Sequence, residues 1–358
     1  MKIKSIGRGI ALTSVAAVVF AACSSSGGST APSAAASAAG SAAASGGAAK
    51  PLKVAFLPKD IVNTYFAAAK LGVDRAAQAD GSTVIQLGPN EAKADLQVPF
   101  IADATTQKVD AILISADGKD EVAPNLKAAM DAGIKVVGFD SSPAVGAYNV
   151  FVNQTDFSLI GGAMAQWACD LAPNCTGEIA ILSATATATN QNSWIADMTT
   201  ALKDPKFAGL KLVDTVYGND NATDSTTQAN ALLTKHPNLK VIVAPTTVGI
   251  LAAAQVVSAA KKQDSVKVTG LGLPNDMKTF VKDGTSPEFG LWNVPALGEL
   301  AYHVAAMLVS GEIKGNEGET FSVKGFNDDK PYTIGKDSVV ILGPPFKFDG
   351  TNIDTFNF

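Results

Sequence analysis

From Leu52 onwards, short apolar runs alternate with longer runs whose apolar residues recur at three- and four-residue spacing. The short runs have the length of buried strands, and the longer runs have the period of amphipathic helices. Strands that alternate with helices join in parallel, because a parallel pair needs a crossover connection between its strands. The sequence therefore predicts an α/β protein that contains doubly wound parallel sheets.

The alternation falls into two similar halves. The first half predicts strands over 53–57, 83–87, 111–115 and 135–139, which alternate with helices over 64–79, 92–107 and 121–132. After a Ser/Pro/Gly/Ala-rich connection, the second half predicts strands over 149–152, 178–183, 210–217, 241–244 and 266–271, with helices over 157–171, 191–203, 223–236 and 248–261. A helix over 276–283, a strand over 288–292 and a long helix over 295–310 follow. The remainder is expected to be irregular except for a strand over 339–342.

The N-terminal residues indicate where the protein works. Lys2, Lys4 and Arg8 precede an apolar stretch that ends in two alanines before Cys23. This pattern predicts a secretory signal peptide over 1–22. Cys23 directly follows the two alanines, and this arrangement resembles the lipobox of bacterial lipoproteins. The resemblance predicts that Cys23 is lipidated; the alternative is an ordinary cleaved signal. Residues 24–50 are almost all Ser, Gly, Ala or Pro, so 23–50 is expected to be a lipid-bearing, disordered tether.

Charge and hydropathy exclude some classes of partner. The formal net charge is −5, and Lys and Arg form no cluster. Nucleic acid is therefore not an expected partner, because phosphate contacts require clustered basic residues. After residue 50, no stretch is apolar and long enough to suggest a membrane span, so the membrane is contacted through the lipid alone.

The two remaining cysteines, Cys169 and Cys175, lie six residues apart. In an exported protein such a pair is expected to form a disulfide; two free buried thiols are the alternative. No His lies near them in the sequence, so a zinc site is not expected, and no cofactor is predicted.

Candidate ligand-binding residues follow the predicted strands, because ligands of open α/β sheets bind at the carboxyl ends of the strands. If the two halves face each other, these polar groups and nearby rings line one cleft, a mixture that suits a polyhydroxylated small molecule. The candidates are Lys59, Asn63, Phe66, Asp117, Asp140, Asn190, Gln191, Trp194, Pro245, Thr247, Trp292 and Asn293.

Each candidate has a structural alternative. Asn190, Thr247 and Asp140 are residue types that also cap helix N-termini. Phe66 and Trp194 have the spacing of core residues on helices, and Lys59 could be a solvated loop residue.

The motifs at the strand ends resemble one known family. They read FLPK (56–59), GFDS (138–141), ATNQNSW (188–194), APTTVGI (244–250) and FGLWN (289–293). Together they resemble the sugar-binding lipoproteins of ABC importers, and the resemblance continues to the ending NIDTFNF (352–358). It implies the type I periplasmic binding protein fold, in which two doubly wound parallel-sheet lobes are joined by a three-strand hinge.

Within this family, two branches look similar to the chain. The runs around Asn190 and Thr247 resemble the rhamnose-binding branch, whereas the autoinducer-2 receptor branch has Asp and Ala at these positions. Lys59, Asp140, Gln191 and Pro245 match both branches.

The resemblance also implies how the chain is divided between the lobes. The first lobe would contain 51–152 and 294–325, and the second 153–293 and 326–345, with a C-terminal tail over 346–358. The chain would cross between lobes near 153–154, near Asn293 and around 325–330.

The implied function is capture of a monosaccharide by hinge closure, followed by delivery to an ABC permease and its ATPase. The ligand would be rhamnose or a similar deoxysugar, and a receptor that senses autoinducer-2 or another sugar is the alternative. The chain is expected to be a monomer on the extracytoplasmic side of the cell membrane. An enzyme is not expected, because the two histidines lie beside no nucleophile motif, and no phosphate-binding or zinc-protease motif occurs.

Overall fold

The computed structural model describes residues 50–358. The predicted signal peptide over 1–22, the lipidation of Cys23 and the tether up to residue 49 lie outside the described residues. Within the described part of the chain, no helix is long and apolar enough to cross a membrane.

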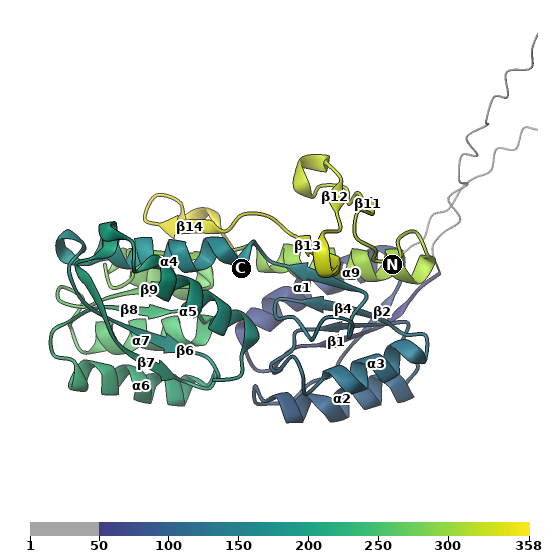
Figure 1. Cartoon of the computed structure of the whole chain (residues 1–358), viewed down its shortest axis with the longest axis horizontal. Helices are drawn as coiled ribbons and strands as arrows, with labels where there is room; N and C mark the ends of the chain where they lie inside the picture. Colours follow the sequence, from purple (N-terminus) through teal and green to yellow (C-terminus); the bar gives the residue numbers. More distant parts are fainter. Residues whose placement is uncertain (1–49) are drawn as a thin grey trace, which may run out of the picture. The chain divides into compact units, whose positions relative to one another are not determined.

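The first sheet is parallel throughout, in the strand order β13-β5-β4-β3-β1-β2. Its strands are β1 (Lys53–Leu57), β2 (Thr83–Gln86), β3 (Ala111–Ile114), β4 (Lys135–Phe139), β5 (Val150–Asn153) and β13 (Val339–Ile341). Its helices are α1 (Thr64–Asp80), α2 (Ala94–Thr106), α3 (Ala123–Asp131) and α9 (Val294–Ser310). They are labelled together in Figure 1.

Both faces of the first sheet are buried, which explains why its strands are continuous apolar runs. In β1, Val54 and Phe56 belong to one apolar cluster with α1 and α9. Ala55 and Leu57 point to the opposite face, where they join a second cluster with α2 and α3. The alternation follows from the two-residue period of a strand.

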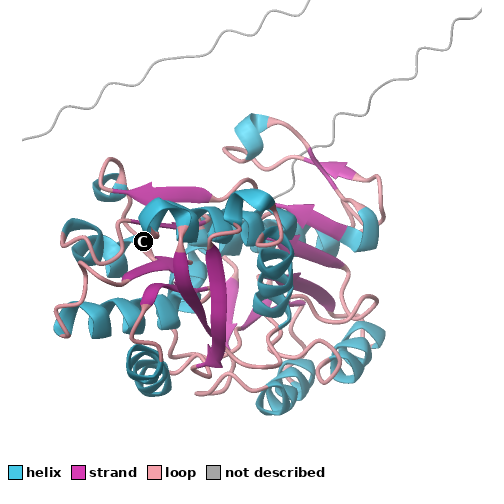
Figure 2. Ribbon diagram, turned by 60° about the vertical axis from the view of Figure 1, so that its left-hand side comes forward, coloured by secondary structure: helices cyan, strands magenta, loops and turns pink. Residues whose placement is uncertain are grey.

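The second sheet is also parallel, in the order β7-β6-β8-β9. Its strands are β6 (Gly177–Ser183), β7 (Leu210–Tyr217), β8 (Leu239–Ala244) and β9 (Lys267–Gly270). Its helices are α4 (Phe157–Leu171), α5 (Thr189–Ala201), α6 (Ala222–Lys235), α7 (Thr247–Ala259) and α8 (Pro274–Lys282). Helices flank the strands of each sheet, as Figure 2 shows. The prediction of parallel α/β architecture is confirmed.

Short elements complete the fold. Strand β10 (Glu288–Leu291) pairs antiparallel with β14 (Phe346–Asp349), and β11 (Thr320–Phe321) pairs with β12 (Tyr332–Thr333). The 3-10 helices are η1 (Pro173–Cys175), η2 (Pro205–Phe207), η3 (Asn327–Asp329), η4 (Lys336–Ser338) and η5 (Ile353–Thr355).

Helix α9 follows the second-lobe strand β10 but packs on α1 of the first lobe. Two glycines allow the close approach: a Cβ atom on Gly72 would lie 1.8 Å from the carbonyl oxygen of Pro295. A Cβ atom on Gly298 would lie 2.0 Å from the carbonyl oxygen of Ala69. Both distances are too short for any side chain, so the close packing of α9 on α1 requires glycine at these two positions.

The C-terminal part departs from the sequence prediction. Residues 326–345 were expected in the second lobe, but β13 pairs in parallel with β5 of the first sheet. The next strand, β14, pairs with β10 beside the second sheet, so it is not a separate tail. The third crossing therefore lies between Ile341 and Phe346, and not around 325–330. Apolar strands this short carry no sequence signal for the sheet they will join.

The structure joins Cys169 and Cys175 by a disulfide, the predicted pairing. Cys169 lies in the last turns of α4 and Cys175 ends η1, so the bond fixes the turn between them.

Candidate functional site

The polar ends of the two sheets meet at Lys59, which follows β1. Its side chain is 2% exposed. Nζ donates to Asn190 Oδ1 at 3.0 Å and to Gln191 Oε1 at 3.4 Å. Both amides belong to the first turn of α5, so the first lobe contacts the second directly at the predicted residues. Lys59 is a buried donor and not a solvated loop residue.

Asp140 follows β4 and is the acceptor in a second buried network. Ser115 Oγ donates to its Oδ2 at 2.6 Å, and Tyr65 OH donates to its Oδ1 at 3.1 Å. From the second lobe, Asn190 Nδ2 donates to Oδ1 at 3.2 Å. The backbone of Asp140 has a φ of 60°, a conformation that Asp adopts more readily than most other side chains.

Burial governs the electrostatics of this network. Burial raises the pKa of Asp140, while Lys59 and the three hydrogen-bond donors act in the opposite direction. Burial, and then the charge of Asp140, raise the pKa of the Tyr65 hydroxyl well above its usual value. Tyr65 therefore stays protonated, which suits its role as a donor to the carboxylate.

Aromatic side chains form the wall next to these polar groups. Trp292 Nε1 donates to Tyr65 OH at 2.9 Å, which extends the chain of donors to Asp140. The rings of Trp194 and Trp292 lie 5.7 Å apart, and Phe66 packs edge-on against Tyr65 at 5.1 Å. Trp194 Nε1 is buried with no hydrogen-bond partner among the described residues.

Polar and aromatic residues from both lobes enclose a small cavity, here called the inner pocket. Its volume is about 30 Å³. It is lined by Lys59, Asn63, Tyr65, Phe66, Asp140, Gln191, Trp194, Asp220, Pro245, Thr246, Thr247, Leu271, Leu291 and Trp292. This volume holds one or two water molecules.

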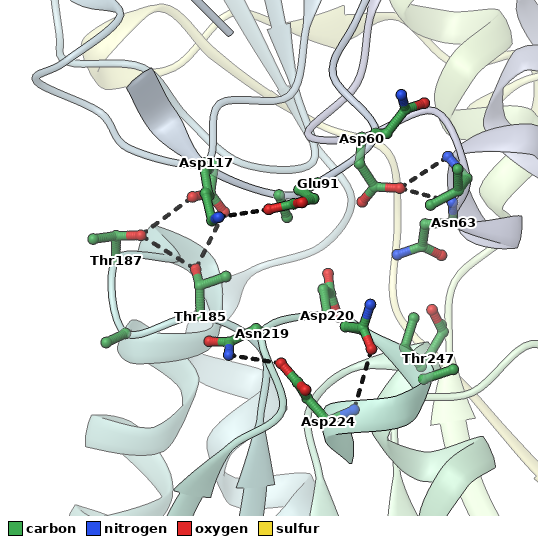
Figure 3. Close-up of a pocket in the computed structure, with 18 of the residues that line it drawn as sticks. Asp60, Asn63, Glu91, Asp117, Thr185, Thr187, Asn219, Asp220, Asp224 and Thr247 are labelled. Atoms are coloured by element: carbon green, nitrogen blue, oxygen red, sulfur yellow. Dashed lines mark hydrogen bonds and ion pairs between the residues drawn. The ribbon is translucent and has the colours of Figure 1, made fainter. Parts of the chain in front are cut away.

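A larger cavity of about 960 Å³ adjoins the inner pocket and shares Asn63, Asp220 and Thr247 with it. We call it the outer cavity (Figure 3). Lys93 is the single basic residue of its described lining. The carboxylates of the lining are Asp60, Glu91, Asp95, Asp117, Glu121, Asp220 and Asp224.

Two of these carboxyl groups have raised pKa values. Burial raises the pKa of Asp60 to about 6, with a smaller contribution from the charge of Asp220 on the other lobe. Burial also raises the pKa of Asp220, against the hydrogen bond from Thr246 and the charge of Lys59. Asp60 Oδ1 accepts from the backbone N–H groups of Val62 and Asn63 at 3.0 and 2.8 Å.

Most of the predicted site residues lie together. The inner pocket is lined by Lys59, Asn63, Phe66, Asp140, Gln191, Trp194, Pro245, Thr247 and Trp292, and Asn190 contacts it through Lys59 and Asp140. Two predicted residues lie elsewhere. Asp117 lines the outer cavity. Asn293 is exposed, and its side chain caps α9 by accepting from Ala296 N at 3.0 Å.

The helix-cap alternative applies to few of the candidates. The caps of α5 and α7 are Ala188 and Thr246, so Asn190 and Thr247 lie inside these helices and turn their side chains to the site. Asn63 does cap α1, where its Oδ1 accepts from Tyr65 N at 2.9 Å.

Sequence reasoning missed Ser115 and Asp220. Ser115 directly follows β3, where the rule for strand ends applies, but the predicted strand over 111–115 includes it. Asp220 lies in the loop after β7, where the same rule applies. Among residues 50–358, no group of three or more His, Cys, Asp or Glu side chains is arranged to hold a metal ion.

Comparison with known proteins places this site in a family. Residues 54–313 match the family described as periplasmic binding protein domain. The chain belongs to this family, whose fold has the two-lobed parallel α/β arrangement described above.

Individual relatives cover most of the chain. An ABC transporter solute-binding protein from Clostridium phytofermentas, solved with bound L-rhamnose, is 37% identical, with a TM-score of 0.82 over 86% of this chain and 98% of that one. LsrB from Clostridium saccharobutylicum, solved with AI-2, is 25% identical, with a TM-score of 0.79 over 86% of this chain and 100% of that one. A D-ribose/D-allose-binding protein from Pseudomonas aeruginosa is 28% identical over 245 residues, which are 65% of this chain and 74% of the relative.

Proposed function

We propose that this protein captures a monosaccharide between its lobes and delivers it to an ABC importer. The observation that carries the proposal is the inner pocket. There Lys59 and Asp140 from the first lobe meet Asn190 and Gln191 from the second. The structural relatives include solute-binding proteins of ABC transporters, which supports the same role.

The chemistry of the pocket suits a sugar. An ammonium group, a carboxylate and two amides offer both donors and acceptors to hydroxyl groups. Phe66, Trp194 and Trp292 offer flat apolar surface to the carbon face of the ring. The buried indole N–H of Trp194 has no partner among the described residues, so it is available to a ligand oxygen.

A 6-deoxysugar such as rhamnose fits this mixture best, because its methyl group needs an apolar wall. Leu271 and Leu291 add aliphatic surface to the rings already in the pocket. The relative solved with L-rhamnose has the higher sequence identity of the two structural relatives described above, which supports the same class of ligand.

Ligand entry requires the lobes to open. A sugar of about eleven heavy atoms does not fit a cavity that holds one or two waters. We infer that hinge motion at the three crossings separates Lys59 from Asn190 and Gln191. The lobes then close again with hydroxyl groups in place of the direct hydrogen bonds between them. A micromolar complex needs about −8 kcal/mol, or roughly −0.7 kcal/mol per heavy atom, which is within the range of small ligands.

A thermal-shift screen tests the ligand class. Rhamnose, fucose, xylose, ribose and autoinducer-2 are compared, and each stabilising compound is titrated by calorimetry. We expect rhamnose to raise the melting temperature most, because ligand bound to the folded state stabilises it. If none of the sugars binds, the proposal is wrong.

A receptor for autoinducer-2 or another sugar, acting in sensing, is the second candidate. The likeness to LsrB, solved with AI-2, favours it. Asn190 and Thr247 distinguish the two, because the autoinducer-2 branch is expected to have Asp and Ala there. The double change Asn190→Asp with Thr247→Ala should shift preference from rhamnose towards autoinducer-2 if the pocket is of the rhamnose type.

We also propose that the protein is exported and held at the membrane by a lipid on Cys23. Mass spectrometry of the N-terminal peptide tests this, since it should begin at Cys23 and carry acyl chains. Cys23→Ser should release the protein from the membrane fraction, and continued retention of this variant would contradict the anchor.

A further inference from the structure

Asp117 is held rigidly at the end of β3. Its backbone N–H donates to Gln97 Oε1 at 2.9 Å. The same Gln97 donates through Nε2 to the carbonyl oxygens of Pro58 and Ser115, at 2.8 and 2.9 Å. Gln97 is fully buried, and Asp117 is 1% exposed. The loops after β1 and β3 are therefore tied to α2, and the position of the Asp117 carboxylate is fixed by them.

The carboxylate of Asp117 points at the other lobe. Thr185 Oγ1 donates to its Oδ1 at 3.2 Å, and Thr187 Oγ1 donates to its Oδ2 at 3.2 Å. Both threonines follow β6 of the second sheet. Figure 3 shows Asp117 above the two threonines at one side of the outer cavity.

Counting protons shows that Asp117 is the preferred acceptor. The hydroxyl oxygens of Thr185 and Thr187 also lie 3.2 Å apart, which gives three contacts. Each hydroxyl has one proton, so only two of the three contacts are hydrogen bonds at any time. Bonds to a carboxylate are stronger than bonds between neutral hydroxyls, so both protons go to Asp117.

The location separates Asp117 from the inner pocket. It lines the outer cavity and does not line the inner pocket. Among residues 50–358, no lysine, arginine or histidine forms a salt bridge with it. Its partners in the closed arrangement are thus the two hydroxyl groups of the second lobe and the amide of Gln97.

We propose that Asp117, Thr185 and Thr187 form a latch at the edge of the cleft, which holds the lobes closed over the ligand. Opening the cleft breaks both hydrogen bonds, and none of the three residues lines the inner pocket, where the ligand is proposed to bind. The latch therefore slows dissociation of every ligand by the same factor and leaves the choice of ligand to the inner pocket. This inference rests on the proposed function, and it replaces the expectation that Asp117 binds the sugar.

The test is a double-mutant cycle on dissociation rates. Asp117→Ala removes one side of the latch, and the combined change Thr185→Val with Thr187→Val removes the other without altering side-chain shape. Thr199→Val is the matched control, because its hydroxyl bonds only within α5, to the carbonyl oxygen of Ile195. Stopped-flow tryptophan fluorescence measures dissociation of L-rhamnose and of a second sugar from the screen.

We expect removal of either side of the latch to speed dissociation about tenfold or more, because two hydrogen bonds to a charged acceptor are lost. The variant that combines all three changes should release the sugar no faster than the faster of its two parent variants. Each parent already lacks both hydrogen bonds of the latch, so nothing more is lost. The factor should be equal for both sugars, and the control should behave as wild type. Additive effects, or a factor that differs between sugars, would overturn the latch.

A second measurement separates this inference from the proposed function. Small-angle scattering of the ligand-free protein should show a larger radius of gyration for Asp117→Ala than for wild type, because the latch acts without a sugar. If no sugar binds wild type, the proposed function fails and scattering alone decides the latch. If sugars bind but neither variant changes scattering or dissociation, the latch fails and the receptor remains.

Discussion

The two lobes contribute different chemistry to the inner pocket. The first lobe supplies charges, Lys59 and Asp140, and it holds Asp140 with its own donors Ser115 and Tyr65. The second lobe supplies the neutral amides of Asn190 and Gln191 in the first turn of α5, and its one carboxyl group in the described lining is Asp220, whose pKa is raised by burial. Charged groups make the stronger hydrogen bonds, and those of the first lobe remain arranged when the cleft opens.

This difference indicates an order of events. A ligand that enters the open cleft meets the preorganised charges of the first lobe, and the amides of the second lobe complete its contacts on closure. Substitutions in the first lobe should therefore weaken the initial complex. Substitutions in the second lobe should mainly speed release.

The largest expected effect is that of Asp140→Ala. The variant loses the acceptor of three hydrogen bonds and removes the negative charge of Asp140 that faces the buried Lys59, so binding should fall below detection. Calorimetry with the sugar measures this, and circular dichroism checks that the variant is folded. Near-normal affinity in a folded variant would remove Asp140 from the site.

A direct comparison of the lobes uses Lys59→Met and Asn190→Ala. Loss of the charged donor should weaken binding about 100-fold, and loss of the neutral amide about tenfold, following the usual values for charged and neutral hydrogen bonds. Equal effects, or a larger effect at Asn190, would contradict the division of roles between the lobes.

The third prediction concerns pH and the buried Asp60. Its pKa is raised by burial from 3.8 to about 6. Between about pH 4 and 6 the folded state keeps the proton that the unfolded state has lost, so stability falls as pH rises through this range and then levels off. Asp60→Asn should remove this dependence and stabilise the protein above pH 6, by less than about 3 kcal/mol.

Melting temperatures of wild type and Asp60→Asn across pH 4 to 8 check the sign. The difference between the two proteins should be smallest at pH 4 and grow to a plateau above pH 6. A difference that shrinks with rising pH would show that the carboxylate is stabilising in the folded state.

The smallest effect on binding is expected for the disulfide. Replacing Cys169 and Cys175 by serine should lower stability by about 2 kcal/mol, the value for closing a short loop. Affinity should not change, because the bond fixes the end of α4 and neither cysteine lines the inner pocket. A loss of affinity in the folded variant would show that α4 transmits strain to the cleft.

The sequence predicted the regular part of the fold because its strands are buried on both faces and its helices are amphipathic. Strand β1 and helix α4, for example, have the predicted bounds. After α9, the predicted strand over 339–342 is present as β13, but β11 and β12, which contain two residues each, were not predicted, and neither was the sheet that β13 joins. So few residues show no period, and pairing with β5 is a contact distant in sequence that nothing local indicates.

At the candidate site, the rule for strand ends located Lys59, Asp140 and Asn190 because it depends only on topology. The same rule could not distinguish residues of the inner pocket from residues of the outer cavity. Asp117 and Asp140 both follow first-sheet strands, yet one lies at the outer cavity and the other at the inner pocket. That distinction depends on the approach of the second lobe, which local sequence does not encode.

The contacts of Lys59 with Asn190 and Gln191 have a consequence for uptake. In the closed arrangement, the Lys59 ammonium group donates to the amide oxygens that a sugar hydroxyl would otherwise use. The closed protein therefore competes with the sugar for these groups. The affinity measured for any sugar is then reduced by the fraction of empty molecules that have already shut. A change that favours the open form without altering Lys59, Asn190 or Gln191 would therefore make the receptor faster to load.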